Sequence, residues 1–126
     1  MRSLLSGIAS GPALVLDEAL SFWGGIDPEN GLIIDRRHPQ QGTSVTGTIL
    51  VMPAGRGSSS SSTVLAEAIR LGTAPSAIVL REVDEIVLLG ALVAEELYAI
   101  TMPVVVATNE EYATFNTGET AEITAD

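Results

Sequence analysis

The second half of the chain alternates short apolar runs with longer segments of helical periodicity, and this order constrains the fold most strongly. Residues 45–52, 77–80 and 104–107 are apolar runs typical of buried strands. Residues 63–71 and 84–97 instead carry apolar side chains at helical spacing. The first half reads as strands and turns only. This order predicts one compact α/β domain of β/β/α type over residues 1–126, rather than a doubly wound Rossmann domain.

Weaker signals complete this outline. Gly72 is a natural helix stop, and Gly90 is a weak point inside the second helical segment. The turn dipeptides Asp27-Pro28 and Asn30-Gly31 mark a long irregular region. The remaining expected elements are a strand over residues 8–16, a short strand at 33–34, a short helix over 110–115 and a final strand over 120–124.

Composition narrows the class of protein. The formal net charge of −10, with arginine as the only cationic side chain, excludes the basic surface that a nucleic acid or an anionic membrane requires. The absence of cysteine excludes disulfides, thiolate nucleophiles and thiolate metal ligands on this chain. No apolar run is long enough to span a membrane, and the N-terminus does not read as a secretory signal. We therefore expect a cytoplasmic protein.

The segment PAGRGSSSSSTVLAEAIRLG joins a predicted strand to a predicted helix. Gly55 and Gly57 allow the backbone to approach a ligand closely, and the helix start offers unpaired N–H groups and a positive dipole end. Arg56 adds a guanidinium suited to a carboxylate or phosphate. These features favour an ordered anion-binding loop. The alternatives are that the serines only cap the helix or form a loose linker.

A serine hydrolase is a further alternative. A serine of this run would need activation by a base, and His38 is the one histidine of the chain. Asp27 or Asp35 would have to complete the triad. The sequence has no GxSxG elbow, and His38 and Asp27 are both in contexts typical of loops and turns.

Three stretches together resemble the small subunit of aconitase X enzymes. These are LSFWGGIDPENGLIIDRRHP, GTILVMPAGRGSSSSSTVLAE and APSAIVLREVDEIVLLGALVAEELY, in this order, from about Gly11 to Val106. The resemblance implies a fold like the swivel domain of aconitase, which is also a β/β/α fold. It further implies a large partner subunit that carries an iron–sulfur cluster or metal ion, with no metal on this chain.

The resemblance also implies roles for the serine loop. The aconitase swivel domain has a Gly-Ser-Ser loop at a helix start, and its first serine is the catalytic base. Gly57, Ser58 and Ser59 match this loop, which makes Ser58 the expected base and Ser59 a substrate or oxyanion contact. Aconitase has an arginine at the next position, where this chain has Ser60. We therefore expect Arg56 to bind the substrate carboxylate, with Gly57 and Ser60 as further substrate-binding positions.

Asp27 and His38 lie in the other blocks that carry the resemblance. We expect them as residues that line the cleft, without a chemical step, although a turn-forming or loop role is equally typical of such residues. An apolar face around Phe22 and Trp23 is expected to meet the partner subunit.

Two activities are implied by the resemblance. One is dehydration of cis-3-hydroxy-L-proline to Δ1-pyrroline-2-carboxylate. The segments FWGG, RRHP and VAEEL resemble the bacterial branch of the family that has this activity. The other is dehydration of (R)-5-phosphomevalonate to trans-anhydromevalonate 5-phosphate. In both cases the chain is expected to be an enzyme subunit that is inactive without its large subunit. The alternative from another class is a non-catalytic anion-binding or regulatory module.

Overall fold

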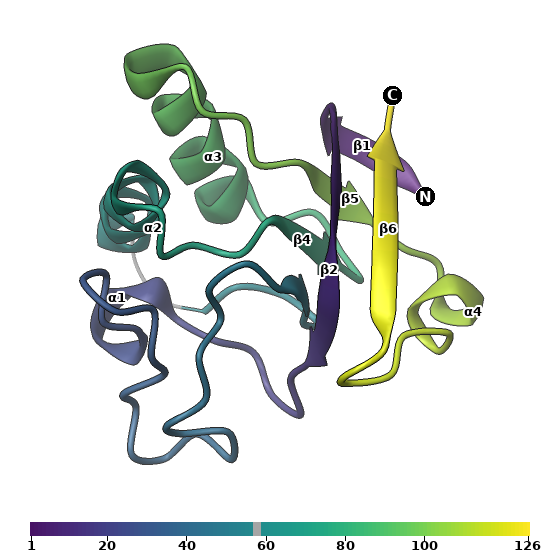
Figure 1. Cartoon of the computed structure of the whole chain (residues 1–126), viewed down its shortest axis with the longest axis horizontal. Helices are drawn as coiled ribbons and strands as arrows, with labels where there is room; N and C mark the ends of the chain where they lie inside the picture. Colours follow the sequence, from purple (N-terminus) through teal and green to yellow (C-terminus); the bar gives the residue numbers. More distant parts are fainter. Residues whose placement is uncertain (57–58) are drawn as a thin grey trace.

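A computed structural model describes residues 1–56 and 59–126 (Figure 1). The strands are β1 (Arg2–Leu5), β2 (Gly7–Val15), β3 (Ile49–Val51), β4 (Ala77–Leu80), β5 (Val104–Val106) and β6 (Thr120–Ala125). The helices are α1 (Phe22–Gly25), α2 (Ser60–Leu71), α3 (Glu85–Tyr98) and α4 (Asn109–Tyr112). The strands form one six-stranded sheet in the order β1-β5-β4-β3-β2-β6. The predicted α/β class is confirmed.

The central strands β2, β3, β4 and β5 are parallel, and β3 and β4 are buried on both faces. Leu50 and Ile78 point toward the side that holds α2 and α3, whereas Ile49 and Val79 belong to a second apolar cluster on the opposite face. Figure 1 shows α1, α2 and α3 on one side of the sheet and α4 on the other. Burial on both faces explains why β3, β4 and β5 are continuous apolar runs in the sequence, whereas β2, which is partly exposed, is not.

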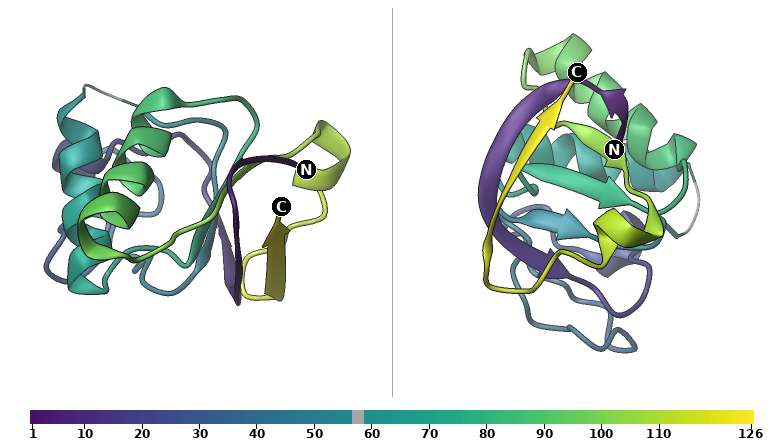
Figure 2. Two further views of the ribbon diagram at one scale, coloured as in Figure 1. Left: turned by 90° about the horizontal axis from the view of Figure 1, so that it is seen from above. Right: turned by 90° about the vertical axis from the view of Figure 1, so that its right-hand side faces the viewer.

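The sheet is curled, and the connection between β1 and β2 requires this shape. Leu5 and Gly7 are separated by one residue, yet β1 pairs antiparallel with β5 while β2 pairs with β3 and β6. The edge strands β1 and β6 therefore come into contact, as the views in Figure 2 illustrate. A Cβ atom on Gly7 would lie 2.8 Å from Pro103 Cγ, so glycine is needed where the chain makes this passage.

The two long helices agree with the sequence patterns at their ends. Gly72 ends α2 in a left-handed conformation, with φ of 78° and its N–H donating to the Ala68 and Ile69 carbonyls, as predicted. Asp84 caps the start of α3. Within residues 1–56 and 59–126, no helix combines the length and the apolar character needed to cross a membrane.

The interpretation of Gly90 as a weak point of its helix is wrong. Gly90 is buried where α3 crosses α2, and an added Cβ would lie 2.9 Å from the Ser62 carbonyl oxygen and 3.1 Å from Leu65. The glycine therefore allows the two helices to pack closely, and this contact outweighs its poor helix propensity.

We expect Gly90→Ala to lower the free energy of unfolding by about 1–3 kcal/mol, because the added methyl group overpacks the α2–α3 contact. In an exposed helix the same change would raise stability by about 1 kcal/mol. The two explanations thus predict changes of opposite sign in the free energy of unfolding. Urea denaturation monitored by circular dichroism distinguishes them. An unchanged or raised unfolding free energy would show that the crossing has spare room.

The first half of the chain contains two elements that the sequence did not predict. They are β1, at the sheet edge, and the short α1, in which Trp23 and Gly24 leave helical geometry. The strand expected at residues 33–34 is absent: Leu32 and Ile33 form isolated bridges, and Ile34 belongs to no strand. Residues 45–48 form a turn that the Thr48 backbone N–H and hydroxyl close by donating to the Val45 carbonyl oxygen. The predicted strand 45–52 thus shortens to β3.

The last predicted helix is shorter and begins earlier than expected. It is α4, Asn109–Tyr112, which a capping box between Thr108 and Glu111 fixes at its start. The Thr108 backbone N–H and the Met1 ammonium group both donate to the Glu111 carboxylate. These contacts lower the pKa of Glu111, with the Thr108 N–H as the larger cause.

Candidate functional site

The predicted catalytic loop connects the end of β3 to the start of α2. Gly57 and Ser58 lie outside the described residues, so the roles of Ser58 as base and of Gly57 in substrate binding stay predictions. The structure does describe both flanks of the loop, from Met52 to Arg56 and from Ser59 onward. Their contacts determine what surrounds the catalytic position.

The described serines, Ser59 to Ser62, are part of the helix start rather than of a loose linker. Ser59 occupies the N-cap position, but its hydroxyl accepts no first-turn N–H, and Ser60 is the exposed first residue of α2. No acidic residue lies in the first turn. The positive end of the α2 dipole therefore faces the loop without a compensating carboxylate of its own helix.

Ser61 holds the start of α2 against α1. Its side chain is buried, and its Oγ accepts a hydrogen bond from the Trp23 backbone N–H at 3.2 Å. The Ser21 hydroxyl donates to the Trp23 carbonyl oxygen, so the Ser61 hydroxyl is the donor in the 3.2 Å contact between the two serines. Ser62 is also buried and donates to the Ser59 carbonyl oxygen at 2.6 Å. Both serines thus have structural roles.

We expect Ser61→Ala to cost about 1–3 kcal/mol of unfolding free energy, because it leaves the partly buried Trp23 N–H without an acceptor. Ser60→Ala is the matched control, since it removes an exposed hydroxyl one residue away and should change stability by less than about 0.5 kcal/mol. Chemical denaturation of both variants makes the comparison. Equal stabilities would argue that the Ser61 contacts are not maintained in solution.

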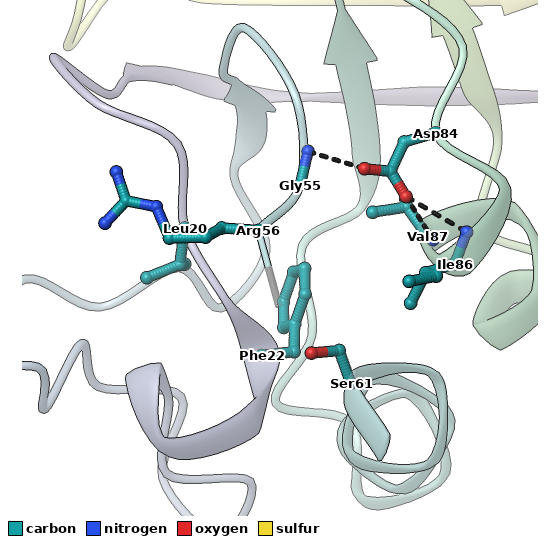
Figure 3. Close-up of a pocket in the computed structure, with 8 residues that line it drawn as sticks. All are labelled: Leu20, Phe22, Gly55, Arg56, Ser61, Asp84, Ile86 and Val87. Atoms are coloured by element: carbon teal, nitrogen blue, oxygen red, sulfur yellow. Dashed lines mark hydrogen bonds between the residues drawn. The ribbon is translucent and has the colours of Figure 1, made fainter. Parts of the chain in front are cut away.

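A small cavity of about 30 Å³ lies beside the loop (Figure 3). Figure 3 shows Phe22 in the middle of the lining residues, with Leu20 and Arg56 to its left and with Ser61 and the start of α3 to its right. The residues that line it are Leu20, Phe22, Gly55, Arg56, Ser61, Asp84, Ile86 and Val87. The cavity thus brings the ends of three segments together: the β3–α2 loop, α1 and the N-terminus of α3.

Asp84 connects the loop to α3. Its Oδ1 accepts hydrogen bonds from the Ile86 and Val87 N–H groups at 3.0 and 2.9 Å, which caps the helix. Its Oδ2 accepts the Gly55 N–H at 2.9 Å (Figure 3). The carboxylate therefore fixes the backbone two residues before Gly57 to a rigid element.

Gly55 is required for this close approach. A Cβ atom at this position would lie 2.6 Å from Asp84 Oδ2 and 3.0 Å from Val87 Cγ2. From the sequence alone, Gly55 is explained by a close approach of the backbone to a ligand, and Asp84 is missed as a site residue. The signal was present, since Asp84 precedes a helical segment as an N-cap does, but a pattern of this kind does not reveal the second, long-range partner.

Arg56 is exposed, and its backbone N–H donates to the Leu20 carbonyl oxygen at 3.3 Å. Its side chain extends past Leu20, away from Ser61 and Asp84 (Figure 3). Within residues 1–56 and 59–126, its guanidinium forms no salt bridge. The group is thus a cation at the rim of the site, pointing outward rather than into the cavity.

Asp27 lies in a long irregular region and forms a tight turn. Its Oδ1 accepts the Glu29 N–H at 2.9 Å, and its carbonyl oxygen accepts the Gly31 N–H at 2.8 Å. Asp27 is not among the residues that line the cavity. Its expected contact with a cleft completed by a partner remains a prediction.

His38 is buried in the same region, and both ring nitrogens are engaged. Nδ1 accepts the Gln40 backbone N–H at 3.0 Å, so the proton is on Nε2, which donates to the Glu18 carbonyl oxygen at 3.2 Å. Its ring contacts are backbone groups rather than the carboxylate of Asp27 or Asp35. The triad that a hydrolase requires is not assembled, and a cleft role for His38 stays a prediction.

The apolar face expected around Phe22 and Trp23 is exposed only at Trp23, and its contact with a partner subunit stays a prediction. Phe22 is buried and lines the cavity, whereas the Trp23 side chain is 61% exposed. The difference arises because α1 turns Phe22 toward the sheet, and Trp23 follows it with non-helical backbone angles.

Comparison with known proteins places this geometry in a family. The family model described as the aconitase X swivel domain matches residues 1–126. A cis-3-hydroxy-L-proline dehydratase of Pseudomonas aeruginosa is 52% identical over 103 residues, which are 82% of this chain and 18% of that protein. The chain therefore spans about a fifth of the length of that relative.

Two further relatives are closer to this chain in size. A phosphomevalonate dehydratase small subunit of Methanothermobacter thermautotrophicus is 41% identical over 93 residues, which are 74% of this chain and 71% of that protein. The crystal structure of aconitase X from Thermococcus kodakaraensis superposes with a TM-score of 0.88 at 34% identity, and covers 99% of this chain and 89% of that one. The chain belongs to the aconitase X swivel-domain family.

Proposed function

We propose that the chain is the swivel subunit of an aconitase X-type dehydratase and that its substrate is cis-3-hydroxy-L-proline. The observation that carries the substrate is the 52% identity to a protein named for this reaction, against 41% to a phosphomevalonate dehydratase small subunit. The candidate site supports a dehydratase reaction. It combines the N-terminus of α2, the outward-pointing guanidinium of Arg56 and the backbone of Gly55, which Asp84 holds in place.

A large partner subunit is part of this proposal. The same domain matches a short part of a long protein in one relative and most of a protein named small subunit in another. Because the domain occurs both as part of a long protein and as a separate small subunit, we expect it to function together with a larger polypeptide. In the long relative, that polypeptide is part of the same chain. We propose that this chain meets that polypeptide as a separate subunit and is inactive without it.

In the proposed reaction, the Ser58 oxygen removes the proton from C2, the carbon that carries the carboxylate. The hydroxyl group leaves C3 and, with one proton, becomes water. The resulting enamine tautomerises to Δ1-pyrroline-2-carboxylate, so that one water molecule is lost overall. A proton beside an ionised carboxylate is weakly acidic, and the developing negative charge needs concentrated positive potential.

The described residues supply part of that potential. The N-terminus of α2 directs its dipole at the loop, and Arg56 is the nearest cation along the chain for the substrate carboxylate. Asp84 holds Gly55 in place, and Ser61 and Ser62 hold the first turn of α2. Ser59 and Ser60, at the helix start, are the proposed further substrate contacts.

The metal centre that the family implies does not fit this chain. The sequence has no cysteine, and residues 1–56 and 59–126 contain no cluster of three or more histidine or acidic side chains that could hold a metal ion. We propose that an iron–sulfur cluster or metal ion is bound by the large subunit. The roles assigned to the residues of this chain are the same whether that group is an iron–sulfur cluster or a metal ion.

Phosphomevalonate dehydration is the second candidate, because the matched region covers 71% of a small subunit named for it. The test is to co-purify this chain with an aconitase X-type large subunit from the same genome, without oxygen, and to follow each substrate by proton NMR. We expect turnover of cis-3-hydroxy-L-proline and none of (R)-5-phosphomevalonate. The reverse result would reassign the substrate, and turnover of neither would favour a non-catalytic anion-binding module.

A further inference from the structure

We propose that the outer face of α3 is the docking surface for the metal-bearing large subunit. This surface, which we call the α3 stripe, consists of Ile86, Leu89, Val93 and Leu97. The inference rests on the proposed function, because it identifies where the partner of that dehydratase binds. It assigns to the partner an apolar ridge bordered by basic side chains.

The α3 stripe is apolar, and the described part of the chain leaves two of its members largely uncovered. Leu89 is 48% exposed and Leu97 is 66% exposed, while Ile86 and Val93 are partly buried, with Val93 packed against the core. The spacing of three, four and four residues aligns these side chains along one side of the helix. Val87, Gly90, Ala91 and Ala94 form the adjoining, buried face of α3. The apolar surface of α3 therefore extends beyond the face that its own domain buries, which favours a further element that covers the rest.

The stripe begins at the candidate site. Ile86 lines the cavity together with Arg56 and Ser61, and the later members of the stripe follow along α3 away from it. A partner that completes the catalytic site must approach this end of the helix. The apolar surface that continues from Ile86 is then covered by the same partner.

A hollow between α2 and α3 provides an anchor point. It has a volume of about 180 Å³ and is lined by Ser62, Thr63, Ala66, Glu67, Val93, Leu97 and Tyr98. Figure 1 shows the two helices next to each other at the outer side of the sheet. Protein interfaces typically insert a large side chain into a hollow of this kind near their centre. The lining favours an apolar or aromatic side chain of the partner.

The charges around the stripe determine what kind of partner fits. Glu85, Glu95 and Glu96 are exposed on α3, and α3 contains no basic residue. Glu67 borders the hollow, and its hydrogen bonds with Arg70 lower the pKa of its carboxyl group. A partner with basic side chains around an apolar ridge matches this rim.

A second copy of this chain fits the surface poorly. Each copy carries a formal net charge of −10, and a symmetric contact through the stripe would bring the glutamates of the two α3 helices together. Like charges across an interface oppose association. The charge distribution therefore favours the large subunit over self-association.

The test compares how tightly variants of this chain bind the large subunit of the proposed dehydratase. A double variant, Leu89→Gln with Leu97→Gln, removes the exposed apolar groups and keeps good helix formers. Leu71→Gln is the matched control, because Leu71 is 42% exposed at the far end of α2. We expect the double variant to bind the large chain at least about 100-fold more weakly, and the control to bind within about 3-fold of wild type. Circular dichroism checks that all three chains are folded.

A second variant tests the charged rim. Glu85→Gln with Glu96→Gln is expected to slow association and to reduce its dependence on salt, because rim charges act mainly on encounter rates. An unchanged association rate and salt dependence would contradict the basic partner surface.

The outcomes separate this inference from the proposed function. If wild-type complex dehydrates cis-3-hydroxy-L-proline and the leucine double variant binds as tightly as wild type, the docking surface is wrong and the function stands. If the wild-type chain does not bind the large chain, both are rejected. If light scattering shows a dimer of this chain that the double variant dissociates, a second copy occupies the stripe and the proposal is overturned.

Discussion

Replacing Ser58 with alanine is expected to lower the kcat of the assembled dehydratase by about 10³- to 10⁴-fold, while the two subunits still associate. The estimate corresponds to the loss of a general base at the upper end of its usual contribution. Other groups would still bind the substrate, so the expected change in KM is small. The measurement is steady-state turnover of cis-3-hydroxy-L-proline, with the subunit affinity determined on the same samples.

The comparison variant is Ser60→Ala, which removes an exposed hydroxyl at the first residue of α2. We expect it to raise KM by several-fold, roughly 1 kcal/mol of binding, and to retain kcat. A Ser58→Ala enzyme with the same profile, a raised KM and a normal kcat, would mean that the loop binds an anion without performing proton transfer.

The second large effect is expected at Asp84, through the loop that it anchors. In Asp84→Asn the side-chain oxygen can still cap α3, because asparagine is as good an N-cap as aspartate. The amide NH₂ then replaces Oδ2 opposite the Gly55 N–H, so that a donor faces a donor. A loop displaced by about 1 Å costs on the order of 100-fold in rate. We expect a kcat loss of this size, together with a loss of about 1–3 kcal/mol of unfolding free energy from the Gly55 N–H that lacks an acceptor.

Gly55→Ala breaks the same contact from the other side, since its Cβ would lie 2.6 Å from Asp84 Oδ2. We expect it to reproduce the kcat loss of Asp84→Asn without changing any charge. Asp84→Ala should add a stability loss of about 1 kcal/mol, because it also removes the helix cap. If Gly55→Ala retained full activity while Asp84→Asn did not, the charge of Asp84 rather than its hydrogen bond would be responsible.

The sequence predicted the fold best where one physical signal dominates. The apolar runs at 77–80 and 104–106 became β4 and β5, because a strand buried on both faces must be apolar throughout. Gly72 predicted the end of α2 through local backbone chemistry. The β1 strand was missed because RSLL is too short and too polar to carry a pattern, and only its pairing with β5 stabilises it.

The candidate site was harder to predict, because its contacts connect residues that are far apart in the chain. No individual structural role was assigned to Ser61 or Ser62 from the sequence, yet Ser61 contacts Ser21 and Trp23 of another segment, and Ser62 donates to the Ser59 carbonyl oxygen. Gly90 was interpreted as a weak point of its helix, because the sequence does not reveal its close contact with Ser62 and Leu65 of α2. Periodicity and capping patterns contain no information on such long-range partners.

The most direct test of the central claim is to measure dehydration of cis-3-hydroxy-L-proline by three samples under oxygen-free conditions. They are this chain alone, the large chain alone, and the two mixed. If this chain supplies part of a shared active site, neither chain alone has activity and the mixture forms Δ1-pyrroline-2-carboxylate. Full activity of the large chain alone, or an inactive mixture in which both chains are folded and bound, would contradict the claim.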